Sequence, residues 1–173
     1  LTQPKAREVK RSRKEDGRCK IEKGRWVDFY TGEQISDPSL AEVDHVVALK
    51  DAWNSGASKW TLAKREEFAN DTLNLTIASK TTNTKKSANS IADMNKWMDR
   101  DSIYACEYVN RYVSVKDKYR LSYSSDEISI IKDFHKKTVK WPSGKKSRCL
   151  VKTAFKETLT GWGLMIPDNR IRK

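Results

Sequence analysis

The stretch Ala41-Glu-Val-Asp-His-Val-Val47 and its continuation Ala48-Leu-Lys-Asp-Ala-Trp53 decide the fold. The first part predicts a short strand over residues 42–47. The second part predicts one or two helical turns, which Asn54-Ser-Gly56 ends. An acid and an imidazole, Asp44 and His45, therefore stand side by side at the end of a strand.

Only two histidines occur in the chain, and their surroundings differ. His135 comes late in a predicted helix among several lysines, where a histidine has an ordinary electrostatic role. His45 directly follows Asp44 and is the better candidate for a general base that works near neutral pH. We therefore interpret His135 as structural or exposed.

Short elements are expected on both sides of the Asp44-His45 pair. Residues 24–35 alternate aromatic and polar side chains before Thr31-Gly32 and predict a hairpin. Residues 59–69 predict a helix and residues 73–78 a strand, after which Ser79 caps a helix that runs through Lys86. A short helix around 91–97, an amphipathic helix over 103–116 and a helix that opens with a capping box at 124–127 complete the pattern.

The two ends of the chain look different from its middle. The first 25 residues predict an irregular basic arm with a short helix around residues 5–14, and the tail predicts a helical stretch near 150–158 and a turn at 161–163. We thus expect an α+β fold in three parts. These are a basic N-terminal arm (1–25), a central domain (26–141) and a basic C-terminal extension packed on that domain (142–173).

Charge is distributed unevenly along the 173 residues, whose formal net charge is +12. Residues 1–25 carry +6 and residues 136–173 carry +9, whereas residues 26–135 carry −3. This surplus favours a polyanionic partner such as nucleic acid, which the basic ends would grip through its phosphates. Solubility alone is the alternative explanation, although it needs no such clustering. No apolar run approaches the roughly 20 residues that cross a bilayer, so we expect a soluble protein without a membrane partner.

The three cysteines, Cys19, Cys106 and Cys149, are far apart and lack Cys-x-x-Cys spacing, which disfavours a structural zinc site. Two of them could form one disulfide if the protein is exported, whereas all three would stay reduced in the cytosol. The sequence does not choose between these alternatives.

Two asparagines follow the Asp44-His45 pair. Asn74 lies in Leu-Asn-Leu, and Asn83 lies in Thr-Asn-Thr-Lys-Lys at the expected start of a helix. The order Asp-His, Asn-Leu and Asn-x-x-Lys is the residue pattern of the HNH, or His-Me finger, nucleases. The match extends to Gly24-Arg-Trp-Val-Asp-Phe-Tyr-Thr-Gly32, Ser55-Gly-Ala-Ser-Lys-Trp60 and Phe68-Ala-Asn-Asp71. Over residues 5–135 the chain therefore resembles the HNH endonucleases found at the C-terminus of GmrSD-type restriction proteins.

The resemblance implies a ββα-metal core with surrounding helices, divalent-cation dependence and phosphodiester hydrolysis. Position by position, Asp44 and Asn83 would be the metal ligands and His45 the base that activates water. Asn74 would belong to the catalytic site by holding the loop between the strands. Many HNH proteins have histidine at the position of Asn83. One carboxylate and one amide oxygen, completed by water, instead suit Mg²⁺, or alternatively Mn²⁺.

Lysines on the predicted helix are the candidates for substrate binding. Lys86 matches the lysine of the family, and Lys85 and Lys80 lie in the same segment. For Lys80 and Lys85 a solvated helix face is an equally good interpretation. Glu42, two residues before Asp44, would point to the same side of the strand, either beside the site or in an exposed or structural role.

We interpret the chain as a metal-dependent endonuclease of low sequence preference, which acts on DNA and for which RNA stays open as a substrate. One alternative is an inactive nucleic-acid-binding protein on the same scaffold. Another is the nuclease domain of a toxin or restriction system. We expect a monomer, and the resemblance implies a secreted protein, with a cytoplasmic location as the alternative.

Overall fold

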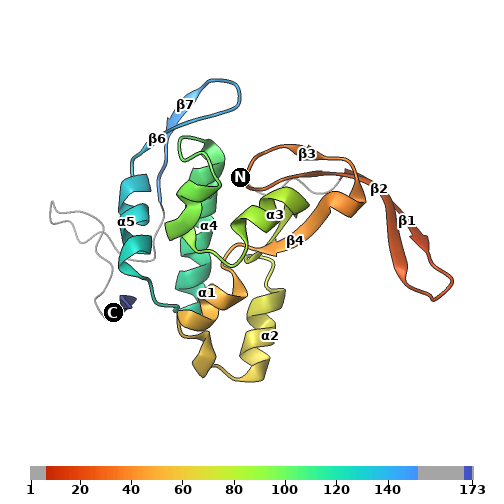
Figure 1. Cartoon of the computed structure of the whole chain (residues 1–173), viewed down its shortest axis with the longest axis horizontal. Coiled ribbons are helices and arrows are strands. Elements are labelled where there is room, and N and C mark those ends of the chain that lie inside the picture. Colours follow the sequence, from red (N-terminus) through yellow and green to blue (C-terminus); the bar gives the residue numbers. More distant parts are fainter. Residues whose placement is uncertain (1–6, 152–169, 173) are drawn as a thin grey trace.

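Small antiparallel sheets and short helices surround one long helix, α4, in an α+β arrangement that the sequence predicted (Figure 1). The structure is a computed structural model, and it describes residues 7–151 and 170–172. The strands are β1 (Arg7–Arg13), β2 (Cys19–Val27), β3 (Gln34–Ile35), β4 (Ala41–His45), β5 (Leu75–Ser79), β6 (Thr138–Lys140) and β7 (Lys146–Arg148). The helices are α1 (Leu49–Asn54), α2 (Leu62–Asn70), α3 (Lys80–Lys86), α4 (Ile103–Tyr119) and α5 (Ser125–Phe134), with 3-10 helices at Pro38–Leu40, Ala57–Lys59 and Ile91–Lys96.

Residues 7–13 form a strand, so the short helix expected around residues 5–14 is wrong. β1 pairs antiparallel with β2, and Gly17 closes their turn at φ 77°, a left-handed conformation that glycine adopts readily. The segment has no apolar periodicity, and the hydrogen bonds from β2 decide its conformation. β2 then continues through residues 25 and 26, where the sequence suggested a boundary between the arm and the central domain.

The predicted hairpin over residues 24–35 is confirmed by the pairing of β2 with β3. Asp28 shapes its turn, because its Oδ1 atom accepts a hydrogen bond from the backbone N–H of Tyr30 at 2.8 Å. The other oxygen, Oδ2, accepts from the backbone N–H of Ser79 at 2.9 Å. This buried aspartate therefore fastens the hairpin to the junction of β5 and α3.

β4 and β5 form a separate antiparallel pair that leads directly into α3. Their register sets Glu42 opposite Ala78 and Asp44 opposite Thr76. Ser79 caps α3 by accepting a hydrogen bond from the backbone N–H of Thr82 at 3.1 Å. The expected succession of strand, strand and helix between residues 42 and 86 is confirmed as secondary structure.

The helices α4 and α5 provide most of the core, and the sequence predicted both. The capping box of α5 is present, since Ser124 Oγ accepts from the backbone N–H of Glu127 and Glu127 Oε2 accepts from that of Ser124. The fully buried large side chains lie mainly on these two helices and the segments beside them, and include Tyr108, Tyr112, Ile131 and Phe134.

A buried ionic cluster joins α1, α4 and α5. The Lys116 ammonium lies 2.8 Å from Glu127 Oε1 and 3.4 Å from Asp51 Oδ2. The Tyr112 hydroxyl lies within hydrogen-bond distance of both carboxylates, and Arg172 approaches Glu127 Oε2 to 3.1 Å. Two cations thus balance two anions, which the desolvated carboxylates require.

The C-terminal part of the chain is tied to α4 by a disulfide between Cys106 and Cys149, and Cys19 is an exposed free thiol. The small hairpin of β6 and β7 precedes Cys149 and spans the predicted boundary at residues 141 and 142. The expected helical stretch near 150–158 and the turn at 161–163 fall almost wholly outside the described residues. Within the described part of the chain, no helix combines the length and apolarity that crossing a membrane needs.

Reducing the disulfide should lower the free energy of unfolding by about 2–4 kcal/mol, because the bond closes a long loop and so restricts the unfolded chain. The two cysteines are 43 positions apart in the sequence. Denaturant unfolding with and without reductant measures the difference, and Cys19→Ser serves as the control that should show the same loss. An unchanged unfolding midpoint would contradict a stabilising role for the bond.

Candidate active site

The candidate site lies where α3 runs alongside β4 (Figure 1). Asn83 Nδ2 donates a hydrogen bond to Glu42 Oε2 at 2.8 Å, and one helical turn later Lys86 Nζ lies 2.9 Å from Asp44 Oδ2. Residues three apart share one face of a helix, and residues two apart share one face of a strand. The helix and strand therefore meet through two successive polar pairs.

Asp44 is almost fully buried, at 8% exposure, and its charge is compensated by two groups. The Tyr30 hydroxyl donates to Asp44 Oδ2 at 2.5 Å, and the Lys86 ammonium contacts both carboxylate oxygens. Burial raises the pKa of Tyr30 well above its usual value, and the negative charge of Asp44 raises it further. Tyr30 therefore keeps its proton and acts as a donor to the carboxylate.

Lys86 is fully buried and does not reach solvent. Its ammonium donates to the backbone carbonyl of His45 at 2.8 Å in addition to contacting Asp44. Burial lowers the pKa of Lys86, while the nearby charge of Asp44 acts in the opposite direction. This placement differs from the direct substrate contact that the sequence suggested for Lys86, because the ammonium is used to hold the end of β4.

His45 is half-buried at the end of β4, and a backbone carbonyl orients its ring. The Nε2 atom lies 2.9 Å from the carbonyl oxygen of Ala69, at the end of α2. A carbonyl can only accept a hydrogen bond, so a neutral imidazole in this contact carries its proton on Nε2 and its lone pair on Nδ1. A lone pair on Nδ1 is what a general base needs. His135, in contrast, is the C-cap of α5, on the other side of α4 from β4 in Figure 1.

Asn74 is fully buried just before β5 and joins the segments that flank the strand pair. Its Oδ1 atom accepts from the backbone N–H of Val47 at 2.8 Å, and its Nδ2 atom donates to the backbone carbonyl of Val47 at 3.3 Å. The Asn74 side chain thus makes to Val47 the two hydrogen bonds that the backbone of a neighbouring strand would make, beyond the end of β4. It fixes where the chain turns away after His45.

The remaining sequence candidates lie on α3. Lys80 and Lys85 are exposed, whereas Asn83 is half-buried. Since Asn83 Nδ2 donates to Glu42, its Oδ1 atom is the group that could bind a cation. Glu42 therefore orients the amide of Asn83.

The side chains of Asp44, Asn83 and Glu42 offer only oxygen ligands, which fits a hard cation such as Mg²⁺. In residues 7–151 and 170–172, no group of three or more His, Cys, Asp or Glu side chains is placed to hold a metal. A cation at this site would hence keep several water ligands, as Mg²⁺ commonly does. It would also share the Asp44 carboxylate with the Lys86 ammonium.

The sequence did not single out two groups that the structure brings into this site. Tyr30 lies in the first hairpin, and only its place in the aromatic run before Thr31-Gly32 could have drawn attention to it. The carbonyl of Ala69 is a backbone atom, so no residue type marks it.

Comparison with known proteins identifies a nuclease-type domain. Residues 4–128 match the family described as GmrSD restriction endonucleases, C-terminal domain. The chain belongs to this family, and the resemblance seen in its sequence is confirmed.

A protein of Arthroderma benhamiae named "Uncharacterized secreted protein" is 35% identical over 116 residues. The aligned region is 67% of this chain and 56% of that relative, so the chain spans little more than half of the relative's length. No solved structure matches the chain.

Replacing Lys86 with methionine should cost roughly 3–5 kcal/mol of unfolding free energy, because Asp44 would stay buried without its cation. Mn²⁺ should then restore part of the loss, since the carboxylate would no longer be shared with an ammonium. Thermal unfolding with and without Mn²⁺ measures both effects. Lys85→Met, at the exposed neighbouring position, is the control and should change stability by less than about 0.5 kcal/mol. A Lys86→Met protein as stable as the wild type would show that the ion pair does not hold this site.

Proposed function

We propose that the protein is a metal-dependent endonuclease that hydrolyses phosphodiester bonds of DNA, with RNA as a second substrate to be tested. The observation that carries the proposal is the setting of His45, whose Nε2 atom bonds to the Ala69 carbonyl beside the buried carboxylate of Asp44. The order β4, β5, α3 supports a ββα-metal core of the His-Me finger type. Membership of a restriction endonuclease family supports the same chemistry.

In the proposed reaction His45 accepts a proton from water on Nδ1 as the water oxygen attacks phosphorus, and the bond between phosphorus and the 3′ oxygen breaks. The departing 3′ oxygen takes up a proton from solvent water. The Ala69 carbonyl stabilises the resulting imidazolium, because it already accepts a hydrogen bond from Nε2. Asp44 and Asn83 would hold the cation. When bound, that cation would supply Lewis-acid stabilisation of the charge that develops on the phosphate oxygens.

Other side chains of the site have positioning roles. Lys86 and Tyr30 fix the Asp44 carboxylate, Glu42 fixes the amide of Asn83, and Asn74 fixes the chain after His45. Lys80 and Lys85 are exposed on α3 and would oppose the negative charge of the substrate. In this scheme contact with the substrate belongs to Lys80 and Lys85, and Lys86 acts through Asp44.

We further propose that the protein acts outside the cell. The Cys106–Cys149 disulfide supports this location, because such bonds persist in oxidising compartments and are rare in the cytosol. The name of the Arthroderma relative, a secreted protein, points the same way.

The His45→Ala variant should lower cleavage of plasmid DNA about 100- to 10,000-fold in the presence of Mg²⁺ or Mn²⁺, since it removes the general base. Circular dichroism checks that the variant is folded. His135→Ala is the matched control, because it removes the other histidine of the chain, and it should cleave like the wild type. Full activity of His45→Ala would exclude the mechanism. A wild-type protein that binds DNA but does not cleave it with any divalent ion would favour the inactive binding protein.

The Asn83→Ala variant should weaken Mn²⁺ binding about tenfold or more, because it removes one of two proposed protein ligands. Isothermal titration calorimetry measures the affinity directly and independently of cleavage. Thr84→Ala, the adjacent exposed position of α3, is the control and should bind Mn²⁺ like the wild type. Equal affinities of the wild type and Asn83→Ala would remove this residue from the metal site.

A further inference from the structure

The β1–β2 hairpin, hereafter the basic ribbon (residues 7–25), projects from the body of the molecule (Figure 1). Nearly all of its described side chains from Lys10 to Lys23 are exposed. Two-stranded hairpins are at best marginally stable alone in water. The ribbon thus adds little to the core and leaves both of its faces accessible to a partner.

One face of the basic ribbon is cationic. The register sets Arg11 opposite Ile21 and Arg13 opposite Cys19, and directly opposed residues point to the same side of a sheet. Beyond a shift in register, Lys23 stands opposite Lys10, so these two lysines share the other face. Glu22 lies on the other face and pairs with Lys10 at 3.6 Å.

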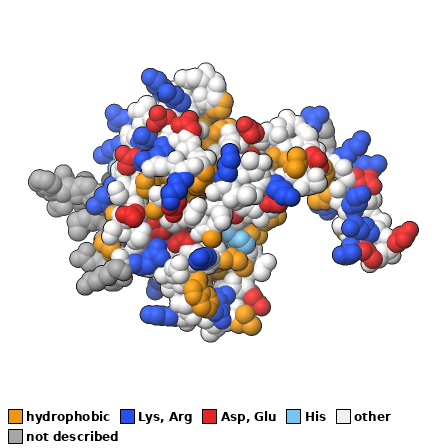
Figure 2. Space-filling view, in the orientation of Figure 1, with side chains coloured by type: hydrophobic (Ala, Val, Ile, Leu, Met, Phe, Trp, Pro, Cys, Tyr) orange, Lys and Arg blue, Asp and Glu red, His pale blue; other side chains and the backbone are white. Residues whose placement is uncertain are grey.

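The cationic face carries two arginines, Arg11 and Arg13. Among the described residues, none brings a carboxylate within ion-pair distance of Arg11 or Arg13. Figure 2 shows the Lys and Arg side chains gathered along the projecting ribbon, with acidic side chains toward its tip. Exposed arginines on a strand pair are complementary to the phosphates of a nucleic acid.

We propose that the basic ribbon is a DNA-binding arm that lies in the major groove of the double-stranded substrate while the body carries the cleavage site. This inference rests on the proposed nuclease function and adds to it the form of the substrate and the surface that binds it. Arg11 and Arg13 contact phosphates on the groove walls. Ile21, at 43% exposure on the same face, contacts the groove floor.

The dimensions of the ribbon favour duplex DNA over other polyanions. Seven residues of strand span roughly 23 Å, and the two strands lie about 4.8 Å apart. The major groove of B-form DNA, about 12 Å wide, admits a two-stranded β-ribbon. The major groove of duplex RNA is too deep and narrow for this, so double-stranded RNA fits the ribbon poorly.

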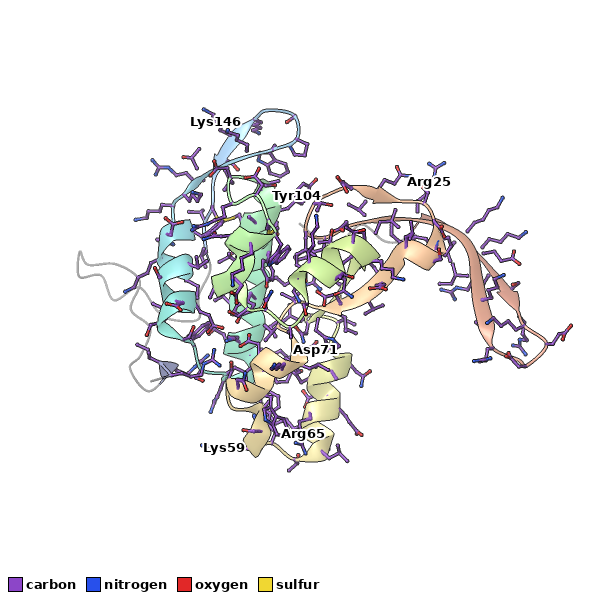
Figure 3. The ribbon with its side chains drawn as sticks, in the orientation of Figure 1. Arg25, Lys59, Arg65, Asp71, Tyr104 and Lys146 are labelled. Carbon is purple, nitrogen blue, oxygen red and sulfur yellow. A yellow bond between two sulfur atoms is a disulfide. The ribbon has the colours of Figure 1, made fainter. Side chains whose placement is uncertain are left out.

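The first experiment measures binding to a DNA duplex of about two helical turns, roughly 21 base pairs. The protein carries His45→Ala, so that the duplex stays intact. Arg11→Gln and Arg13→Gln are combined in a ribbon variant. Lys59→Gln and Lys132→Gln, at exposed positions off the ribbon, form a control of equal net charge. Figure 3 shows Lys59 far from Arg25 at the base of the ribbon.

The ribbon variant should bind the duplex at least about tenfold more weakly than the control does. Its plot of log affinity against log salt concentration should be flatter by about 0.9 for each phosphate that the protein no longer neutralises. Equal weakening of the two variants would overturn the proposal. It would show that the ribbon charges act only through net charge, or only keep the exposed strand edges from pairing with other chains.

A second measurement tests whether the ribbon occupies the major groove. Guanine N7 atoms face the major groove, so their methylation by dimethyl sulfate reports whether the groove is covered. The His45→Ala protein should protect guanines of the bound duplex, and the ribbon variant should not. Binding of the DNA without protection of its guanines would contradict a major-groove arm. An equal loss of affinity of the ribbon variant for duplex RNA or for phosphatidylserine vesicles would also contradict it.

Cleavage separates failure of this inference from failure of the proposed function. In the wild-type background, ribbon substitutions should slow cleavage of duplex DNA while leaving cleavage of bis(p-nitrophenyl) phosphate unchanged. If duplex cleavage matches that of the control variant, the ribbon assignment fails and the nuclease stands. If DNA binding depends on the ribbon but no divalent ion supports cleavage, the nuclease proposal fails and the ribbon assignment stands.

Discussion

Asp44 carries a negative charge in a place that water barely reaches, so that charge must be compensated from within the protein. Lys86 from α3 and Tyr30 from the first hairpin provide this compensation. Three segments that are distant in sequence are therefore fixed at one point. Lys86 also binds the carbonyl of His45, so the same ammonium sets the position of the neighbouring histidine. The geometry of the candidate site depends on this one ion pair.

The segments around the ion pair have two different roles: some hold the backbone in place, and others present charge to solvent. Asp28 and Asn74 hold the hairpin and the chain after β4 by hydrogen bonds to backbone atoms. The exposed lysines of α3 and the basic ribbon contribute little to the stability of the fold, yet they carry the charge that a polyanion would meet. Stability thus comes from the helical core and its disulfide, while the proposed substrate contacts come from surfaces outside that core.

The sequence predicted those features that local chemistry determines. Ser79 and the pair Ser124 and Glu127 marked the starts of α3 and α5, because caps act within one helical turn. β4 ends at His45, two residues before the end that the sequence predicted at residue 47. The strand β1, in contrast, depends on a partner strand and was taken for an irregular segment with a helix. The burial of Lys86, its contact with Asp44 and the choice of Cys106 and Cys149 for the disulfide depend on packing between distant segments, which residue spacing does not encode.

The most direct test is a crystal structure of the protein soaked in Mn²⁺, with an anomalous difference map collected at the manganese edge. We expect a peak within ligand distance of a carboxylate oxygen of Asp44 and of Oδ1 of Asn83, with His45 beside it and its Nε2 atom on the Ala69 carbonyl. A metal-dependent site here would be contradicted by a well-ordered crystal that shows no peak at this position and in which Lys86 is the only cation in contact with the Asp44 carboxylate.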